Sequence, residues 1–360
     1  MQEETHNTNI NSISPLPSPE SLKKGIPLSE ISWKTVDQGR KVIPQILSGK
    51  DRRLLAIVGP CSIHNIDESK RYAKKLSLLS DELKDVLYIV MRVNCDKPRS
   101  RAKTNGRASW QGLFNDPKMN GSYDMELGFR LARELILYVN EMGLPVATEM
   151  LEKINYQMID DLLSYVWIGA RNTNSQEQKK VASGASTVVG FKNPTDGLID
   201  VAAHAIEFAK HCHVFAAPTD NGVTSRFSTK GNAYGHLILR GSDNGPNCDK
   251  GNIRSAVKKL SELGLISRVI VDCSHGNSHK NHEKQREVIG SLLPQIKEGG
   301  DIAGIMYESF LEDGKQNIPV DLSKLRPGVS VTDGCDGWKR TEKTLREFAE
   351  ELRKITKEKR

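Results

Sequence analysis

The segment LLAIVGPCSIH, residues 54–64, begins with five apolar residues and ends in a polar turn that carries Cys61 and His64. Short apolar runs that end in a turn predict buried β-strands. The same pattern recurs along the chain, and most of the runs are followed at once by an ionisable side chain. The predicted strands lie at 54–58, 88–93, 145–148, 166–169, 188–191, 236–239, 268–271 and 302–306.

The intervals between these runs mostly have the apolar spacing of amphipathic helices, as in Ser69–Leu83, Asp124–Glu141 and Ile199–Lys210. Strands that alternate with helices predict βα units and a parallel sheet. Eight such units favour a closed (β/α)8 TIM barrel over an open sheet. The fold class that we predict is therefore α/β, a TIM barrel with an N-terminal extension. A spare apolar run at 214–219 either forms a hairpin or extends the sixth strand.

The domain organisation that we predict has two parts. Residues 1–50 form an N-terminal arm and a helix (Ser29–Leu47), with oligomer contacts and a possible regulatory role; residues 1 to about 20 are polar, which predicts disorder. Residues 51–360 form the catalytic barrel, closed by an amphipathic helix at Thr341–Lys354.

Composition narrows the class of protein. With 37% hydrophobic and 27% charged residues, no apolar run long enough for a membrane span and no signal-like N-terminus, we expect a cytoplasmic protein without a membrane partner. The six cysteines form no CxxC pair, so we expect reduced thiols. The net charge of +7 comes from basic residues interleaved with acidic ones, which argues against a nucleic-acid partner. Only the basic run Lys97–Arg107 stands apart, and it suits a small polyanion.

Cationic side chains stand at or just after the predicted strand ends. Residues at the carboxyl ends of barrel strands converge on one face, so these cations would repel one another unless they bind a multiply charged anion. Phosphate and carboxylate are the natural partners of guanidinium groups. The alternative, a solvated surface charge, is weaker for the four in apolar context than for the two in a polar loop. The four are Arg92, Arg171, Lys192 and Arg240; the two are Lys97 and Arg99.

A second set of candidate site residues combines a thiol, an imidazole and two carboxylates. Three of them follow or end predicted strands, and the fourth lies in a turn closer to the C-terminus. Such mixed ligands suit a divalent ion such as Mn²⁺, Fe²⁺, Co²⁺ or Zn²⁺. Taken one by one, a cysteine can simply pack in the core and an aspartate can simply shape a turn. The candidate ligands are Cys61, His275, Glu308 and Asp333.

From about Pro15 to Leu352 the chain resembles the class I 3-deoxy-D-arabino-heptulosonate 7-phosphate (DAHP) synthases, the first enzymes of the shikimate pathway of aromatic amino acid biosynthesis. The resemblance rests on many motifs in one order. They are GKDRRLLAIVGPCSIH (49–64), MRVNCDKPR (91–99), WQGLFNDP (110–117), IGAR (168–171), SQ (175–176), ASG (182–184), VGFKNPTDG (189–197), GN (231–232), HLILRG (236–241), DCSHGNS (272–278), YES (307–309) and TDGCDGW (332–338).

The resemblance implies a metal-dependent condensation of phosphoenolpyruvate with D-erythrose 4-phosphate that releases phosphate. It also implies a homodimer or a homotetramer. Lys97 is the first choice for proton transfer, and Cys61 and His275 complete the catalytic set. The implied metal ligands are Cys61, His275, Glu308 and Asp333; the implied phosphoenolpyruvate contacts are Arg92, Lys97, Glu149, Arg171, Lys192 and Arg240; the implied aldose-phosphate contacts are Pro98, Arg99 and Ser100.

The sequence departs from the family beside the expected aldose-phosphate position. After Lys97-Pro98-Arg99-Ser100, residues 101–109 intervene before Trp110 and add three basic side chains. This longer loop is either a tolerated insertion or the mark of a different second substrate or subunit contact. Asn172 and Ser225-Arg226-Phe227 are two further departures.

The resemblance also implies a pocket for an aromatic amino acid that inhibits many family members. Ser186 and Phe215 are compatible with such a pocket, whereas Tyr156 is bulkier and Ala217 less polar than in the sensitive enzymes. We therefore predict weak or absent control by single aromatic amino acids.

Three hypotheses for the function follow. The first is a DAHP synthase that uses erythrose 4-phosphate, and the second is a related synthase with a different aldose or aldehyde in a specialised pathway. The octulosonate 8-phosphate synthases share the chemistry but lack the KPR loop. The third hypothesis, a catalytically silent barrel that binds a partner, conflicts with the complete set of metal and cation positions.

Overall fold

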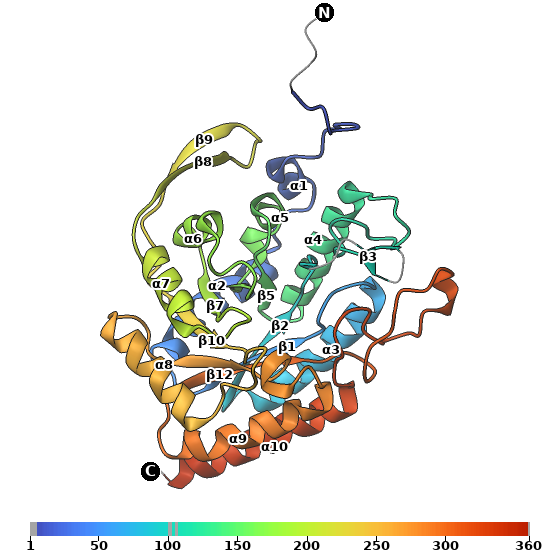
Figure 1. Cartoon of the computed structure of the whole chain (residues 1–360). Coiled ribbons are helices and arrows are strands. Elements are labelled where there is room, and N and C mark those ends of the chain that lie inside the picture. The colour runs from blue at the N-terminus through green and yellow to red at the C-terminus, as the bar shows by residue number, and fades with distance from the viewer. Residues whose placement is uncertain (1–5, 100–102, 105–106, 359–360) are drawn as a thin grey trace, which may run out of the picture.

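The computed structural model describes residues 6–99, 103–104 and 107–358, with 103–104 and 107–108 described by their backbone alone. Eight parallel strands close into a barrel in the order β1-β12-β11-β10-β7-β6-β5-β2 (Figure 1). The predicted (β/α)8 fold is confirmed, and the predicted strand positions agree within one or two residues. The barrel strands are β1 (Leu54–Gly59), β2 (Leu87–Arg92), β5 (Val146–Glu149), β6 (Tyr165–Ile168), β7 (Val188–Lys192), β10 (Gly235–Leu239), β11 (Val269–Asp272) and β12 (Ile302–Glu308).

Side chains along each strand alternate between the barrel interior and the surrounding helices. In β1, Leu55 and Ile57 belong to the interior cluster, whereas Leu54 and Ala56 pack outward. The same alternation in β2 places Val90 inside, and Arg92 two residues later on the same side. The last inward position of a strand therefore carries the polar side chain that faces the mouth of the barrel.

The helices form an outer layer around the barrel, and α9 and α10 lie side by side along one flank (Figure 1). Three predicted helices are found with the same C-terminal residue, and the closing helix extends beyond its predicted bounds at both ends. The helices of this layer are α3 (Ile66–Leu83), α4 (Met125–Glu141), α5 (Lys153–Gln157), α6 (Gln176–Ser183), α7 (Ile199–Lys210), α8 (Lys250–Glu262), α9 (Gln285–Lys297) and α10 (Trp338–Glu358).

Helix α2 (Glu30–Leu47) closes the amino-terminal end of the barrel. Ser29 caps it by accepting a hydrogen bond from the backbone N–H of Ser32. Its apolar residues Ile43, Ile46 and Leu47 are fully buried and share one cluster with the inward side chains of the strands. The helix and the barrel therefore share a core, while the proposed division of the chain at residue 50 stays a prediction.

Strands β8 (Val214–Pro218) and β9 (Thr224–Ser228) form an antiparallel hairpin beside the barrel, so the run at 214–219 belongs to a hairpin and does not extend the sixth strand. The hairpin arches toward the short helix α1 (Pro19–Gly25) near the N-terminus (Figure 1). Lys23 of α1 joins the two segments, with Nζ 2.8 Å from a carboxylate oxygen of Asp220 and 2.7 Å from one of Asp160. The N-terminal segment is thereby anchored to the hairpin turn.

The long loop after β2 contains a two-residue ladder between β3 (Lys103–Thr104) and β4 (Arg107–Ala108). Ser100 and Arg101 lie outside the described residues. All six cysteines are free thiols. Among the helices of the described chain, none combines the length and the hydropathy that a bilayer crossing requires.

Candidate active site

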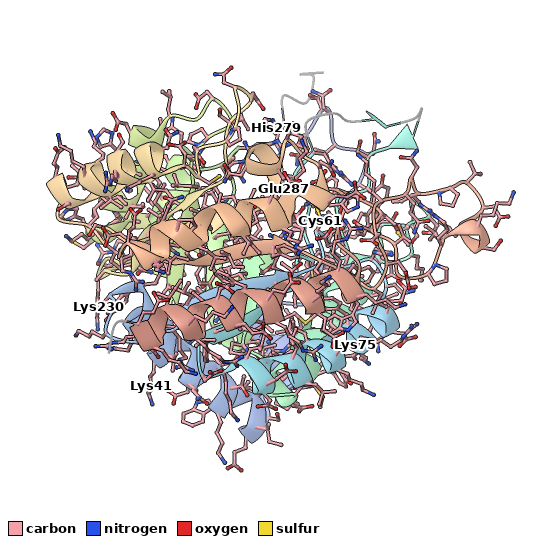
Figure 2. All side chains as sticks on the ribbon, turned by 90° about the horizontal axis from the view of Figure 1, so that it is seen from below. Lys41, Cys61, Lys75, Lys230, His279 and Glu287 are labelled. Carbon is pink, nitrogen blue, oxygen red and sulfur yellow. The ribbon has the colours of Figure 1, made fainter. Side chains whose placement is uncertain are left out.

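A cavity of about 630 Å³ opens at the carboxyl ends of the barrel strands. Cys61 and Arg92 are buried and contact the lining residues Lys97 and Glu308. In the view of Figure 2, Cys61 lies away from the outline of the molecule, whereas the exposed Lys41 and Lys230 lie at its edge. The convergence that the sequence predicts is therefore present. The predicted site residues that line the cavity are Lys97, Pro98, Arg99, Glu149, Arg171, Lys192, Arg240, His275, Glu308 and Asp333.

Two cations of the site, Arg92 and Lys192, are buried and pack on the buried indole ring of Trp167; we call this group the floor of the site. The Arg92 guanidinium lies 5.1 Å and the Lys192 ammonium 5.8 Å from ring centroids of Trp167. Arg92 Nη2 donates to Glu308 Oε1 at 3.0 Å, and Lys192 Nζ donates to Asp272 Oδ2 at 2.6 Å. Each buried cation thus has one carboxylate partner and a ring face that also favours positive charge.

Several guanidinium N–H groups in this floor lack a hydrogen-bond partner among the residues that the structure describes. Nε and Nη1 of Arg92, and Nη1 of Arg240, are buried and donate no hydrogen bond to any described residue. Unsatisfied buried donors are costly, and charge-assisted bonds to phosphate or carboxylate oxygens satisfy them. The arrangement is therefore suited to a small ligand with several anionic oxygens. Arg171 stands at the exposed rim of the same cavity.

Glu149 lies at the carboxyl end of β5, and its side chain extends to Gly169 at the end of the neighbouring strand β6. A Cβ atom on Gly169 would collide with Oε1 of Glu149, so the carboxylate lies where only glycine leaves room. The backbone N–H of Glu149 donates to Oδ1 of Asn94 at 3.0 Å. The hydrogen bond fixes the backbone of Glu149, and Gly169 leaves room for its carboxylate at the cavity wall.

Three of the four predicted metal ligands converge. Cys61, Glu308 and Asp333 each place one ligand atom within 4.8 Å of the other two. Lys97 lies against them, with Nζ donating to Cys61 Sγ at 2.8 Å. A thiol and two carboxylates are a donor set that suits borderline divalent ions, so these residues fit the implied metal.

The charges of this group are strongly coupled. Burial and the nearby Glu308 raise the pKa of Cys61 to about 12, while Lys97 acts in the opposite direction. Burial also opposes ionisation of Asp333, but Lys97 and His275 outweigh it and hold the pKa of Asp333 below its ordinary value. A divalent ion favours the thiolate, so metal binding would release the Cys61 proton.

His275 lines the cavity but does not belong to the group within 4.8 Å. Its Nδ1 lies 2.9 Å from Asp272 Oδ2 and 2.8 Å from the hydroxyl of Ser274. A carboxylate on one ring nitrogen orients an imidazole for ligation through the other. His275 would therefore contribute Nε2, and its place among the ligands stays a prediction.

Both ends of the long loop after β2 are pinned at its base. The backbone N–H of Lys97 donates to the carbonyl of Gln111 at 2.8 Å, and Arg99 Nε donates to the carbonyl of Trp110 at 2.7 Å. The described segments on either side of the additional residues therefore lie next to each other at the exposed Arg99. The insertion leaves Lys97 and Pro98 in the cavity wall.

Three residues of the site were not assigned a role from the sequence. Asp272 pairs with both Lys192 and His275; Trp167 supports the two buried cations; the amide of Asn94 joins the carbonyl of Cys61 to Glu149. Asp272 and Asn94 each stand at or just after a strand end, which is the signal that marked the other candidates. No such signal was present for Trp167, because an aromatic residue inside a predicted strand is typical of the hydrophobic core.

The fold and the site together define a barrel enzyme with a pocket for an anionic substrate beside a candidate metal centre. The sequence model of the DAHP synthetase I family matches residues 26–346. The chain is 41% identical over 348 residues, 96% of each chain, to the Tyr-sensitive phospho-2-dehydro-3-deoxyheptonate aldolase of Salmonella typhimurium. It is 43% identical over 338 residues, 94% of this chain and 95% of the relative, to the Trp-sensitive enzyme of Escherichia coli strain K12.

A solved structure agrees with these similarities. The phospho-2-dehydro-3-deoxyheptonate aldolase of Francisella tularensis SCHU S4 superposes with a TM-score of 0.92 at 40% identity and covers 96% of this chain and 99% of its own. The chain belongs to the DAHP synthetase I family.

Proposed function

We propose that this protein is a 3-deoxy-7-phosphoheptulonate synthase, which condenses phosphoenolpyruvate with D-erythrose 4-phosphate and releases phosphate. The observation that carries the proposal is the pairing of unsatisfied buried guanidinium groups with the Cys61, Glu308 and Asp333 cluster in one cavity. The membership in the family and the names of the relatives support the same reaction.

The cations of the floor would hold phosphoenolpyruvate. Its carboxylate and phosphate together match the donors that Arg92 and Arg240 leave unsatisfied. Lys192 adds a positive charge that Asp272 keeps in place, and Arg171 closes the rim. Because these groups are fixed before the substrate arrives, they orient the enol phosphate at little further entropic cost.

The acceptor carbonyl would lie beside Cys61, Glu308 and Asp333, with His275 as the fourth proposed ligand. A bound Mn²⁺, Fe²⁺, Co²⁺ or Zn²⁺ would supply Lewis acidity toward the aldehyde oxygen. Carbon 3 of phosphoenolpyruvate attacks the aldehyde carbon, water adds to carbon 2, and phosphate leaves by cleavage of its bond to carbon 2. The protein contributes charge compensation through Arg92, which contacts Glu308 directly.

Lys97 is the residue that we assign to proton transfer. Its ammonium contacts the thiol of Cys61 and lies 3.9 Å from Asp333. Burial alone would lower the pKa of Lys97, but Cys61, Asp333 and Glu308 outweigh it and raise the pKa above its ordinary value. Lys97 therefore enters the reaction as an ammonium that can give a proton to an oxygen that gains negative charge.

Pro98, Arg99 and Ser100 are the proposed contacts of the aldose phosphate. The exposed guanidinium of Arg99 stands at the cavity rim, where a phosphate at the far end of the acceptor would lie. The basic insertion that follows Ser100 supports a second candidate function, condensation with a different aldose or aldehyde.

Phosphate release tests these alternatives on metal-free protein reconstituted with single metals. The proposed function predicts release from phosphoenolpyruvate only when erythrose 4-phosphate is present. Release that requires another aldehyde supports the second candidate. No release with any acceptor and any of the four metals would contradict both.

We also propose a cytoplasmic homodimer or homotetramer. The free thiols support a reducing compartment. The exposed apolar residues Ile10, Ile13 and Leu16 of the N-terminal arm support burial against another subunit. Light scattering of the purified chain at micromolar concentration measures the assembly, and a monomer would contradict it.

A further inference from the structure

A second cluster of metal-ligating side chains lies beside the active site, and one member, His282, lines the same cavity. His282, Asp313 and Asp336 each place one ligand atom within 4.8 Å of the other two. They come from three separate segments: a 3-10 turn (His282–Lys284) after β11, the loop after β12, and the residues that lead into α10. None of the three belongs to the set that we assign to the reaction.

Asp336 is the buried member of this cluster, and its side chain is fully shielded from solvent. Tyr307 on the outer side of β12 donates its hydroxyl to Oδ2 of Asp336. The other oxygen, Oδ1, accepts no hydrogen bond from any described residue. A buried carboxylate oxygen without a hydrogen-bond donor is costly, and a cation closer to Oδ1 than the 3.5 Å of Arg340 would lower that cost.

The loops around the cluster are shaped to bring its members together. A Cβ atom on Gly334 would lie 2.8 Å from Nδ1 of His282, so glycine is what lets the imidazole approach this backbone. The backbone N–H of Gly337 donates to Oδ1 of Asp313 at 2.7 Å and thereby fixes that carboxylate. The imidazole of His282 is partly buried against this backbone, with a ring nitrogen near both carboxylates.

Arg340 is the resident positive charge of the cluster. Its guanidinium nitrogens lie 3.5 Å from Asp336 Oδ1, 3.5 Å from Asp313 Oδ2 and 3.6 Å from Glu283 Oε1. All three distances exceed those of strong charge-assisted hydrogen bonds. Its side chain is one third exposed, so it can turn toward solvent when another cation enters.

We propose that His282, Asp313 and Asp336 form a second divalent-cation site, distinct from the Cys61 cluster. One imidazole and two carboxylates suit Mn²⁺, Co²⁺ or Zn²⁺. Asp336 and the candidate active-site ligand Asp333 belong to one short segment, 333–337, so a cation here would fix that segment. The proposal does not depend on which reaction the enzyme catalyses.

Cobalt binding to the metal-free, full-length protein tests the proposal. The number of Co²⁺ ions per chain is measured by equilibrium dialysis with elemental analysis, and their ligands by absorption spectroscopy. We expect wild type to bind one more ion per chain than Asp336→Asn, and the lost ion to lack the thiolate-to-cobalt charge-transfer band that ligation by Cys61 produces. Equal ion numbers in the two proteins would overturn the site.

Two further variants keep the test decisive if Asp336→Asn folds poorly. His282→Gln changes a partly exposed residue and should lose the same single ion, whereas the control His204→Ala, an exposed histidine of α7, should lose none. Arg340→Met should tighten the second binding event by about tenfold or more, because it removes the competing charge. Unchanged or weaker binding in Arg340→Met would contradict the arrangement.

Discussion

Lys97 donates a hydrogen bond to the thiol of Cys61 over 2.8 Å, so the proposed proton donor and a proposed metal ligand are in direct contact. The pair links the loop after β2 to the end of β1. A change in the charge of either residue therefore alters the other, and this coupling makes Lys97 the first position to test.

Lys97→Met should lower kcat/KM by about 10²–10⁴, the usual loss of a general acid. It should also remove the alkaline limb of the pH profile, which lies above the ordinary lysine range because the pKa of Lys97 is raised. Steady-state rates across pH measure both effects, with the exposed Lys41→Met as the control. A Lys97→Met enzyme with the wild-type pH profile would rule out the role in proton transfer.

Arg92→Lys should weaken phosphoenolpyruvate binding strongly while it preserves the charge. A lysine cannot reproduce the planar fork, and Glu308, buried beside it, would lose its 3.0 Å partner. Calorimetric titration with phosphoenolpyruvate measures the loss, and an affinity within threefold of wild type would count against the assigned contact.

Arg99→Ala should raise KM for the aldose phosphate and leave KM for phosphoenolpyruvate nearly unchanged. Arg99 is exposed at the rim, while the phosphoenolpyruvate donors are buried in the floor. Initial rates with each substrate varied in turn separate the two constants. Equal increases in both would show that Arg99 acts on the whole pocket.

Asp272→Asn should destabilise the protein most at neutral pH. Burial opposes the charge of Asp272, but His275 and Lys192 outweigh it and hold its pKa well below the ordinary 3.8. A carboxyl with a depressed folded-state pKa stabilises fully above its unfolded pKa, and this stabilisation falls as the pH drops toward the folded value. Urea unfolding at pH 7 and pH 3 should show a larger difference between wild type and variant at pH 7; the opposite order would contradict the pairing.

Free phenylalanine, tyrosine and tryptophan should inhibit weakly or not at all, although relatives carry the names Tyr-sensitive and Trp-sensitive. Phe215 stacks on Phe227 with ring centroids 5.6 Å apart, and the ammonium of Lys153 lies 4.0 Å from the Phe227 ring centroid. These aromatic faces already have partners, and Tyr156 is buried nearby. Rates with each amino acid at micromolar concentrations test this, and strong inhibition by any one of them would refute it.

The barrel could be predicted from the sequence because the period of apolar residues and the polar strand ends are local patterns. The place of the cations Arg92, Lys192 and Arg240 in the site could be predicted as well, because each occupies or follows a strand end. The ion pairs between side chains of different strands could not be predicted in the same way. That Asp272 lies between Lys192 and His275 depends on the order of strands around the barrel and on side-chain rotamers.

The cluster of His282, Asp313 and Asp336 could be predicted even less, because its members come from segments that are distant in the sequence. His282 follows β11, whereas Asp313 and Asp336 follow β12 at different distances, and no sequence spacing links them. Asp336 lies only three residues after Asp333, so the sequence predicts that both belong to the same turn. Only the folded loops show that the two carboxylates serve different clusters.

Helix α2 seals the amino-terminal end of the barrel with Ile43, Ile46 and Leu47, and this has a kinetic consequence. Reactants would then enter through the carboxyl-terminal mouth. On the proposed assignment, phosphoenolpyruvate lies deeper, at the buried Arg92 and Lys192, than the aldose phosphate at the exposed Arg99. We therefore expect an order of binding with phosphoenolpyruvate first and the aldose second.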